Sequence, residues 1–528
     1  MADILYKKTG DIFNQHSYWT KQPVDAITYY IEKYTKKSDV VLDPFCGSGM
    51  TGLAAKLTGR KAMLGDLSPA AVHISKGFNL EIDFSKDKLS DFLQRADKEI
   101  GHLYKTNCIQ CGKEAEIKYE IIGETYLKED GSSFTEAEEV FNSIKHQTKY
   151  SSEIDRKAFK FNGFEPIKYC YICPCSKNKI FKNLDDKDWK KLKEIQKIKR
   201  SFPAEDFFGK ESKRNLKKNI FKVKDLYSEK NLFALNRLLE LIKHEDKGNF
   251  YEFLMFNFSA IVFNCSLMSR YREYENTSIK MGTYYVPAII KDNNVLISFM
   301  RKALKNFESK TNLMKLFLSH SVDISQMDAT SLIGLKDESV DFIYTDPPYV
   351  DIINYSELNL VWEAWLSIYK PSKNEMIVCK EENKSLDYYY DLFAKFFAEA
   401  ARVLKKGSYM VVIFHHPNIE YWGRLQKLIL DSNFSVEMND TPVRLISQNK
   451  TSSQHKTNKN TQTFMGIVLK KQGLKKPKSR VLLKMDSEVV KEIQIKAEEC
   501  GFHSSSEQYD YLINYSMNRY DLSSLVPK

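Results

Sequence analysis

A glycine turn between an apolar strand and a helix constrains the fold of this chain more than any other feature. The turn spans residues 43–49 (DPFCGSG); it follows the apolar residues 40–42 (VVL) and precedes a helical pattern that begins near Met50. Strand, glycine turn and helix in this order build the start of a nucleotide-type cofactor pocket, because glycine lets backbone amides approach a ligand closely. The sequence therefore predicts an α/β, Rossmann-like domain with a cofactor site at this turn.

An acidic residue follows the turn at the expected distance. The helix predicted at residues 50–57 leads to a second apolar strand at 61–65, which ends at Asp66. Nucleotide-binding folds place an acid about 20 residues beyond the glycine turn, at the tip of the second strand, where it binds ribose hydroxyls. Asp66 is therefore the candidate ribose ligand. The Gly-x-Gly-x-x-Gly spacing of residues 47–52 also fits a dehydrogenase, which is the competing interpretation of this motif alone.

A second motif, residues 346–349 (DPPY), follows the apolar strand 340–344. Each proline pushes the preceding residue into an extended conformation, so this loop is rigid and cannot be helical. Together the two motifs resemble the cofactor and catalytic motifs of S-adenosylmethionine-dependent methyltransferases that act on exocyclic amino groups of nucleic-acid bases. The dehydrogenase interpretation gives no role to the second motif. The resemblance covers roughly residues 12–80 and 320–470.

The resemblance implies a Rossmann-like sheet of seven strands, S-adenosylmethionine as cofactor, and a role for each motif residue. The residues it assigns to the cofactor are Thr20, Asp43, Phe45, Gly47, Gly49, Asp66 and Asp328. The residues it assigns to catalysis are Asp346, Pro347, Pro348 and Tyr349. An exocyclic amine is a poor nucleophile because its lone pair is delocalised, so acceptors for its protons are needed. The Asp346 side chain and the Pro347 carbonyl would accept them, while Tyr349 would stack on a base flipped out of the helix. Asp rather than Ser at position 346 favours adenine over cytosine in this family.

The charge of the chain favours a polyanionic partner. The 80 basic residues exceed the 69 acidic residues, which gives a formal net charge of +11. Two basic clusters lie at residues 187–224 and 470–480. No apolar run approaches the roughly 20 residues of a membrane span, and no signal peptide is recognisable, so we expect a cytoplasmic protein that does not enter membranes.

Five of the nine cysteines form two close groups and predict a structural zinc site. Two CxxC pairs, Cys108 with Cys111 and Cys170 with Cys173, have the spacing of a zinc ribbon, in which each pair supplies two thiolates. Cys175 leaves the second pair ambiguous, because Cys173 and Cys175 could serve instead. The alternative is a set of buried free thiols.

The motif order predicts a catalytic domain with a long insertion and a small C-terminal module. The predicted regions are 1–80 and 311–470 for the two catalytic halves, 81–310 for an inserted target-recognition region, 471–479 for a basic linker and 480–528 for the terminal module. That module resembles a ribbon-helix-helix unit, which would make the protein a homodimer; a helical hairpin that packs on the catalytic domain is the alternative. The candidate nucleic-acid contacts are Arg270, Arg272, Arg480 and Lys484.

We therefore expect a site-specific DNA methyltransferase that modifies the N6 amine of adenine in double-stranded DNA. A restriction-modification or defence system, with a corresponding protein partner, is the context that the resemblance suggests. The alternatives are methylation of the cytosine N4 amine, methylation of the guanine amino group in transfer RNA, and a catalytically inactive DNA-binding regulator. The last alternative predicts damaged motifs, whereas Gly47, Gly49, Asp66 and residues 346–349 are all intact.

Overall fold

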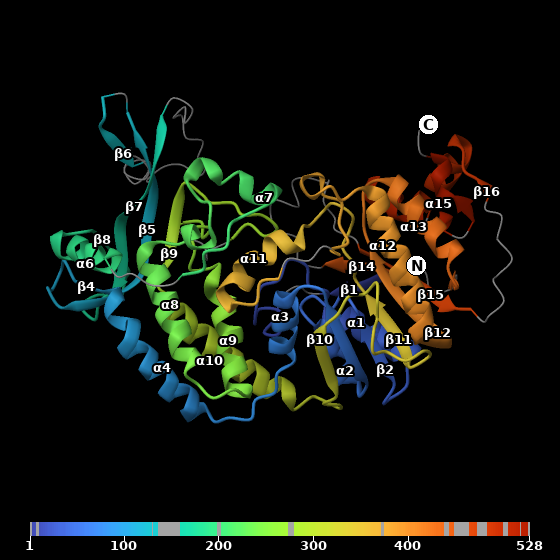
Figure 1. Cartoon of the computed structure of the whole chain (residues 1–528), viewed down its shortest axis with the longest axis horizontal. Coiled ribbons are helices and arrows are strands. Elements are labelled where there is room, and N and C mark those ends of the chain that lie inside the picture. Colours follow the sequence, from blue (N-terminus) through green and yellow to red (C-terminus); the bar gives the residue numbers. More distant parts are fainter. Residues whose placement is uncertain are drawn as a thin grey trace.

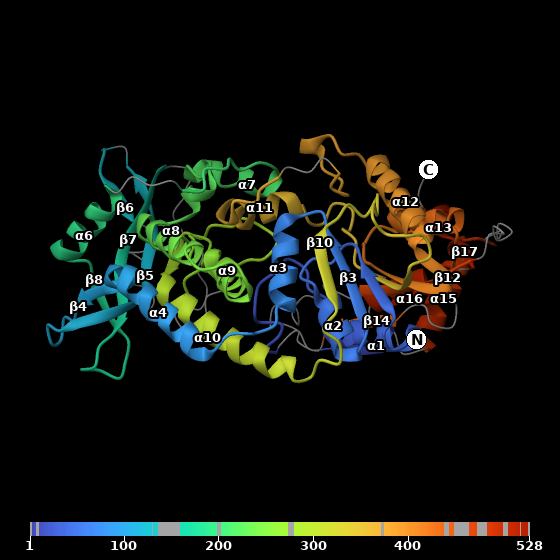
Figure 2. The ribbon, with the colours of Figure 1, turned by 60° about the horizontal axis from the view of Figure 1, so that its bottom comes forward.

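Two β-sheets organise the part of the chain that the computed structural model describes. The described residues are 3–6, 10–128, 130–135, 159–197, 202–272, 279–370, 374–437, 443–447, 464–472, 483–499, 505–517 and 519–525 of the 528. The smaller sheet lies at one end of the molecule and the larger sheet toward the other end, with helices from the middle of the chain between them (Figure 1, Figure 2).

Within the described residues, the larger sheet has nine strands rather than the seven expected. In spatial order these are β1 (Asp3–Tyr6), β14 (Val443–Ser447), β15 (Phe464–Lys471), β12 (Leu404–Phe414), β11 (Val340–Thr345), β2 (Val40–Asp43), β3 (Lys61–Asp66) and β10 (Val322–Gln326), with β13 (Phe434–Val436) also paired to β15. The excess has a simple origin. Strands β13 and β14 pair with successive parts of the same edge of β15, so one strand position is filled by two pieces, and β1 adds a further strand beside β14.

The five neighbouring strands β12, β11, β2, β3 and β10 run parallel, so their carboxyl ends meet at one edge of the sheet. Strand β2 illustrates why they lie in the centre, because Val41, Leu42 and Asp43 are all buried, as expected for a parallel strand covered on both faces. The helices of this domain are α1 (Val24–Tyr34), α2 (Met50–Thr58), α3 (Pro69–Asn79), α11 (Tyr355–Leu366), α12 (Leu386–Val403) and α13 (Ile419–Asp431). None of the described helices is long and apolar enough to cross a membrane.

The segment between α3 and β10 forms the second sheet and a group of helices. Its strands are β4 (Lys105–Asn107), β5 (Glu114–Leu127), β6 (Ser133–Thr135), β7 (Lys160–Ile172), β8 (Ile180–Asn183) and β9 (Ile289–Asn293). Its helices are α4 (Lys86–Ile100), α6 (Asp186–Gln196), α7 (Lys210–Lys213), α8 (Glu229–Lys243), α9 (Asn249–Val262) and α10 (Val295–Met314). The boundary expected between residues 310 and 311 lies inside α10.

Helix α9 joins the inserted segment to the catalytic domain through buried contacts. The Phe256 ring packs edge-on against Phe78 of α3, with ring centroids 5.3 Å apart. The Trp362 indole of α11 donates a hydrogen bond of 3.0 Å to the carbonyl oxygen of Ser259. These contacts bury aromatic surface on both sides, so the two parts share one continuous hydrophobic core.

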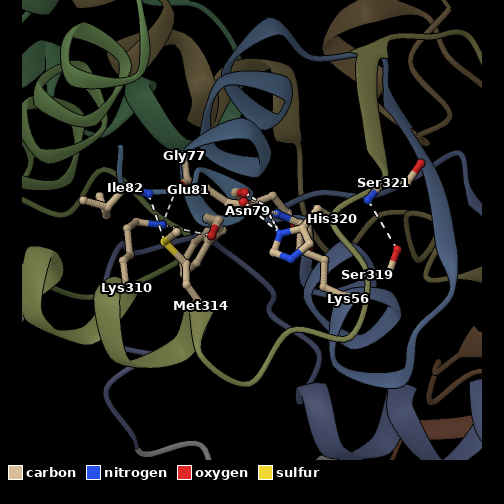
Figure 3. Close-up of polar contacts among 12 residues, drawn as sticks. Lys56, Gly77, Asn79, Glu81, Ile82, Lys310, Met314, Ser319, His320 and Ser321 are labelled. Atoms are coloured by element: carbon tan, nitrogen blue, oxygen red, sulfur yellow. Dashed lines mark hydrogen bonds and ion pairs between the residues drawn. The ribbon is translucent and has the colours of Figure 1, made fainter. Parts of the chain in front are cut away.

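A polar cluster holds the place where the chain leaves and re-enters the catalytic domain (Figure 3). Buried Lys310 of α10 donates hydrogen bonds of 2.6 and 2.9 Å to the carbonyl oxygens of Gly77 and Phe78 at the end of α3. Lys56 of α2 forms an ion pair of 2.6 Å with Glu81, which also accepts from the His320 imidazole at 2.9 Å. A helix end carries carbonyls without helical partners, so the hydrogen bonds from Lys310 stabilise the exit of the chain.

The C-terminal module packs on α13 of the catalytic domain. Its elements are β16 (Leu483–Lys484), α15 (Ser487–Glu499), α16 (Ser505–Ser516) and β17 (Tyr520–Asp521). The buried Gln426 amide of α13 donates to the carbonyl oxygens of Met517 and Tyr520, at 2.9 and 2.8 Å. Strand β16 pairs in parallel with β17 of the same chain, whereas a ribbon-helix-helix unit would pair it with a second copy. The alternative of a helical module on the catalytic domain therefore describes the arrangement better, and a homodimer through this strand stays a prediction.

Candidate active site

A cavity of about 360 Å³ lies at the carboxyl edge of the parallel strands. Segments that follow β2, β3, β10 and β11 line it, as expected for a ligand site in an open α/β sheet. Both sequence motifs border this cavity although they are about 300 residues apart in the chain. The lining includes these residues chosen from the sequence: Thr20, Asp43, Phe45, Gly47, Asp66, Asp328, Asp346 and Pro348.

The glycine turn is fixed by its own backbone and by two acids. The Thr51 hydroxyl donates a hydrogen bond of 2.5 Å to Asp43, and the backbone N–H of Phe45 donates to the other oxygen of that carboxylate at 3.2 Å. The backbone N–H of Gly47 donates to Asp66 at 3.0 Å. In this structure Asp43 orients the loop.

Gly49 lies behind the turn rather than in the cavity lining. Its φ of +76° is in the left-handed region, and a Cβ atom built there would lie 2.1 Å from the Ser75 hydroxyl oxygen of α3. Only glycine lets the loop approach α3 this closely. The Asn79 amide on the same helix donates a hydrogen bond of 2.9 Å to the Gly49 carbonyl oxygen and so fixes the contact.

Two donors hold the Asp346 carboxylate of the second motif. The Gln22 side-chain amide donates to one oxygen at 2.7 Å, and the Tyr349 hydroxyl donates to the other. The Tyr389 hydroxyl of α12 donates to the Pro348 carbonyl oxygen at 2.7 Å. The next residue, Val350, has a φ of +53°, which is strained for a β-branched side chain. The surrounding hydrogen bonds therefore hold the loop in a strained conformation, as is typical of functional sites.

The position of Tyr349 differs from the sequence expectation. Its ring is 7% exposed, packs edge-on against Phe414 with centroids 5.9 Å apart, and does not line the cavity. Burial, together with the nearby Asp346 carboxylate, raises the pKa of the Tyr349 hydroxyl well above its ordinary value, so it remains a donor. In this conformation Tyr349 orients Asp346, and stacking on a base would require the ring to leave this place.

Carboxylates give the cavity a strongly acidic lining. Burial is the main reason that the pKa of Asp43 rises to about 8, that of Asp66 to about 6 and that of Glu363 to about 7. Neighbouring carboxylates raise these pKa values further. Groups of like charge in a buried site favour a cationic ligand, because a positive charge relieves both desolvation and repulsion.

The sequence analysis missed several residues of this cavity. Gln22 lies two residues beyond Thr20 in the segment 16–23, but its contact partner Asp346 is 324 residues away, so no local pattern reveals it. Glu363 accepts from the Ser68 hydroxyl at 2.8 Å and lies on α11, a helix rich in apolar residues. Tyr355 accepts or donates a hydrogen bond of 2.8 Å with Thr20. Each of these contacts depends on tertiary structure.

The cysteine cluster corrects one choice of the sequence analysis. The thiols of Cys108, Cys111, Cys173 and Cys175 lie within 4.8 Å of one another. Cys170 does not join them. It lies within strand β7, which continues to Ile172, and packs with Tyr119 and Ile121 in a separate apolar cluster. A knuckle needs a turn between its two thiols, and the turn begins only after Cys173.

The candidate nucleic-acid contacts are exposed where the structure describes them. Arg270 and Arg272 follow α9, and Arg270 forms an isolated bridge with Ile290 of β9. Lys484 is exposed on β16. Arg480 and most of the linker 471–479 lie outside the described residues. The structure thus leaves the first three side chains accessible without bringing them to the cavity lining.

Comparison with a family model points to the two segments that carry the motifs. A family model described as DNA methylase, of the N6/N4 type, matches residues 4–77 and 340–512, which contain both motifs. The type II methyltransferase M2.LlaDCHI from Lactococcus lactis subsp. cremoris is 41% identical over 58 residues, which make up 10% of this chain and 22% of the relative. The match thus spans about a fifth of that relative. Both likenesses are to DNA methyltransferases, and both leave most of the inserted segment unexplained.

Proposed function

We propose that this protein is an S-adenosylmethionine-dependent methyltransferase that modifies the N6 amine of adenine in double-stranded DNA at a specific sequence. One observation carries the proposal. The glycine turn and the DPPY loop border a single acidic cavity at the carboxyl edge of the parallel strands, and both lie in the segments that match the DNA methylase family. A restriction-modification or defence context is the setting we propose, by analogy with the type II relative.

The residues around the cavity fit this cofactor. S-adenosylmethionine, when bound, supplies a methyl group on a positively charged sulfonium. Asp43, Asp66 and Glu363 offer the negative charge that such a cation needs, while Asp66 is also placed at the tip of β3 for ribose hydroxyls. Asp328 lies at the end of β10, where the resemblance assigns it to the adenine amine of the cofactor. Thr20, Phe45 and Gly47 complete the lining on the side of the glycine turn.

The DPPY loop would bind the target amine. In this proposal the Asp346 carboxylate and the Pro347 carbonyl accept hydrogen bonds from the two amine N–H groups, which directs the nitrogen lone pair toward the methyl group. The N–C bond would form as the C–S bond breaks, and one amine proton is lost from the nitrogen afterwards. Gln22 and Tyr349 orient Asp346 for this purpose. Because positioning supplies most of the rate in such a transfer, the strained and well-braced loop is suited to it. A flipped base has to reach the cavity, so Tyr349 is proposed to move from its buried place and stack on that base.

Two alternatives concern the same site. Methylation of the cytosine N4 amine would use the same acceptors, and the matched family covers both N6 and N4 amines. Asp346 in place of serine is the feature that favours adenine. Methylation of a guanine amino group in transfer RNA would also suit the two motifs.

Mass spectrometry of nucleosides tests the proposal. The protein is expressed in a host that lacks adenine methylation, and genomic DNA and total RNA are digested and analysed beside a culture that expresses Asp346→Ala. The proposal expects N6-methyladenine in DNA with the wild type and much less of it with Asp346→Ala. N4-methylcytosine, or a new methylated guanine in RNA, would replace it with the corresponding alternative. No new methylation from soluble protein that binds the cofactor would favour an inactive regulator.

A further inference from the structure

We propose that Cys108, Cys111, Cys173 and Cys175 bind one structural zinc ion per chain, in a site that joins two hairpins of the smaller sheet. The Sγ atoms of Cys108 and Cys175 lie 3.6 Å apart, and those of Cys111 and Cys173 lie 3.4 Å apart. All four thiols fall within 4.8 Å of one another. None of the four cysteines lines the cavity described above, and the inference does not depend on the proposed methyl transfer.

The local structure presents each thiol on a turn. Cys108 follows β4 and Cys111 precedes β5, and the backbone N–H of Gly112 donates to the Cys108 carbonyl oxygen at 2.8 Å to close the first loop. Gly112 has a φ of +73°, which the turn requires. The second loop, between β7 and β8, is closed by a bond of 3.0 Å from the Ser176 N–H to the Cys173 carbonyl oxygen. The two loops therefore offer two sulfurs each, as structural zinc sites do.

The spacing of the sulfurs favours a single tetrahedral ion. A zinc–thiolate bond is about 2.3 Å long, and the edge of a tetrahedron is about 1.63 times the distance from centre to corner, so the sulfurs around one ion should be about 3.8 Å apart. The observed distances of 3.4 and 3.6 Å agree with that value. An iron–sulfur cluster would place several metal atoms between the thiolates and spread them further. Disulfide bonds would need sulfurs about 2.05 Å apart.

The site has hydrogen-bonding support and no place for a reactive water. The backbone N–H of Gln110 donates to the Cys108 sulfur at 3.4 Å, and the Ile109 N–H donates to the Tyr171 hydroxyl of β7 at 3.0 Å. Cys108 and Cys173 are buried, whereas Cys111 and Cys175 are exposed. Four thiolates complete a tetrahedron, so the ion would hold structure rather than perform chemistry.

Strand pairing, apolar packing and an ionic cluster also join the two hairpins. Near the site, Lys182 of β8 donates to the Thr106 hydroxyl of β4 at 2.8 Å and forms an ion pair of 2.8 Å with Asp188 of α6. These contacts lie on the same end of the sheet as the thiols. A metal ion that binds the folded state and not the unfolded chain adds its binding free energy to the stability of this sheet.

Metal analysis of the purified full-length protein tests the site. We expect about one zinc per chain in the wild type and less than a fifth of that in Cys111→Ser and Cys175→Ser, whose side chains are exposed. Cys170→Ala is the matched control, because Cys170 lies three residues before Cys173 yet packs elsewhere, and it should retain the full zinc content. A wild type purified with zinc in the medium that contains no metal would overturn the inference, as would iron in place of zinc.

A second measurement covers variants that fold poorly. The wild type is stripped with a chelator under reducing conditions and refilled with Co²⁺ alone. The absorption of tetrahedral thiolate-bound cobalt, saturating at one equivalent, supports the site. Saturation with the spectrum of octahedral oxygen ligands, or no cobalt binding by folded protein, contradicts it. Loss of zinc in Cys170→Ala with retention in Cys175→Ser would show that the original CxxC pairing was right and the assignment from the structure wrong.

Discussion

Substitution of Gly49 by alanine tests how much the close contact between the glycine turn and α3 contributes to stability and to cofactor binding. The new Cβ would lie 2.1 Å from the Ser75 hydroxyl oxygen and 2.9 Å from the Asn79 amide nitrogen. A left-handed backbone costs alanine about 1 kcal/mol, and overpacking of this kind costs about 1–3 kcal/mol more. We therefore expect Gly49→Ala to lower the free energy of unfolding by about 2–4 kcal/mol and to weaken S-adenosylmethionine binding at least tenfold, because the loop that lines the cavity must shift.

Gly407 offers a matched control for the backbone contribution. Its φ of +75° is nearly the same, but a Cβ there would meet no atom within 4 Å. Gly407→Ala should cost only the backbone part, about 1 kcal/mol, and leave cofactor binding unchanged. Denaturant unfolding and calorimetric titration of the cofactor measure both quantities. In the double variant with Ser75→Gly, the two costs should be less than additive, because Ser75 supplies the nearest atoms. Equal effects of the two alanine variants would refute the reasoning.

Three further predictions concern the catalytic loop, the acidic cavity and the polar cluster. Asp346→Ala should lower kcat about 10²–10⁴-fold and change cofactor affinity less than tenfold. Gln22→Ala should lower kcat about tenfold with little change in KM, because Gln22 positions the Asp346 carboxylate. Steady-state kinetics and cofactor titration measure these effects, and a loss of cofactor binding in either variant would contradict the roles. A bound cation favours ionised carboxylates, so the affinity for the cofactor should rise from pH 6 to pH 8 and level off above the pKa of about 8 for Asp43. An affinity that calorimetry finds unchanged over this pH range would contradict a cationic ligand. Burial lowers the pKa of Lys310 to about 7, well below its unfolded value, so between pH 7 and 10 the unfolded chain binds one more proton than the folded chain. The unfolding free energy of the wild type relative to Lys310→Met should therefore rise with pH by up to about 1.4 kcal/mol per pH unit over this range. A difference that does not change with pH would mean that Lys310 stays charged in the folded protein.

Local patterns predicted the catalytic elements closely because each one is determined by neighbouring residues. The strand expected at 61–65 is β3 (Lys61–Asp66), and the helix expected from Met50 is α2. Strand, turn and helix follow from a short apolar run, glycines and a helical repeat, all within 30 residues. The family resemblance assigned a cofactor role to the first motif and a catalytic role to the second, and in the structure both motifs border one cavity.

The features that the sequence did not reveal depend on distant contacts or on strand ends. The CxxC pattern at 170–173 looked like a knuckle, but strand β7 continues past Cys170 and turns it toward Tyr119. The predicted number of strands was wrong for two reasons: one position of the sheet is filled by the two short strands β13 and β14, and β1 adds a strand beside β14. Glu363 was not predicted because its only visible signal is a contact in the folded protein. The Ser68 hydroxyl, 295 residues away in the sequence, donates a hydrogen bond to its carboxylate.

Transfer of a labelled methyl group tests the central claim most directly. Purified protein is incubated with S-adenosylmethionine that carries a deuterated methyl group and with unmethylated genomic DNA, and the digested nucleosides are analysed by mass spectrometry. The account predicts deuterated N6-methyladenine with the wild type and an initial rate of its formation about 10²–10⁴-fold lower with Asp346→Ala. Label that appears with both proteins, or label on a ring carbon of cytosine, would contradict the claim that the DPPY loop directs methyl transfer to an exocyclic amine.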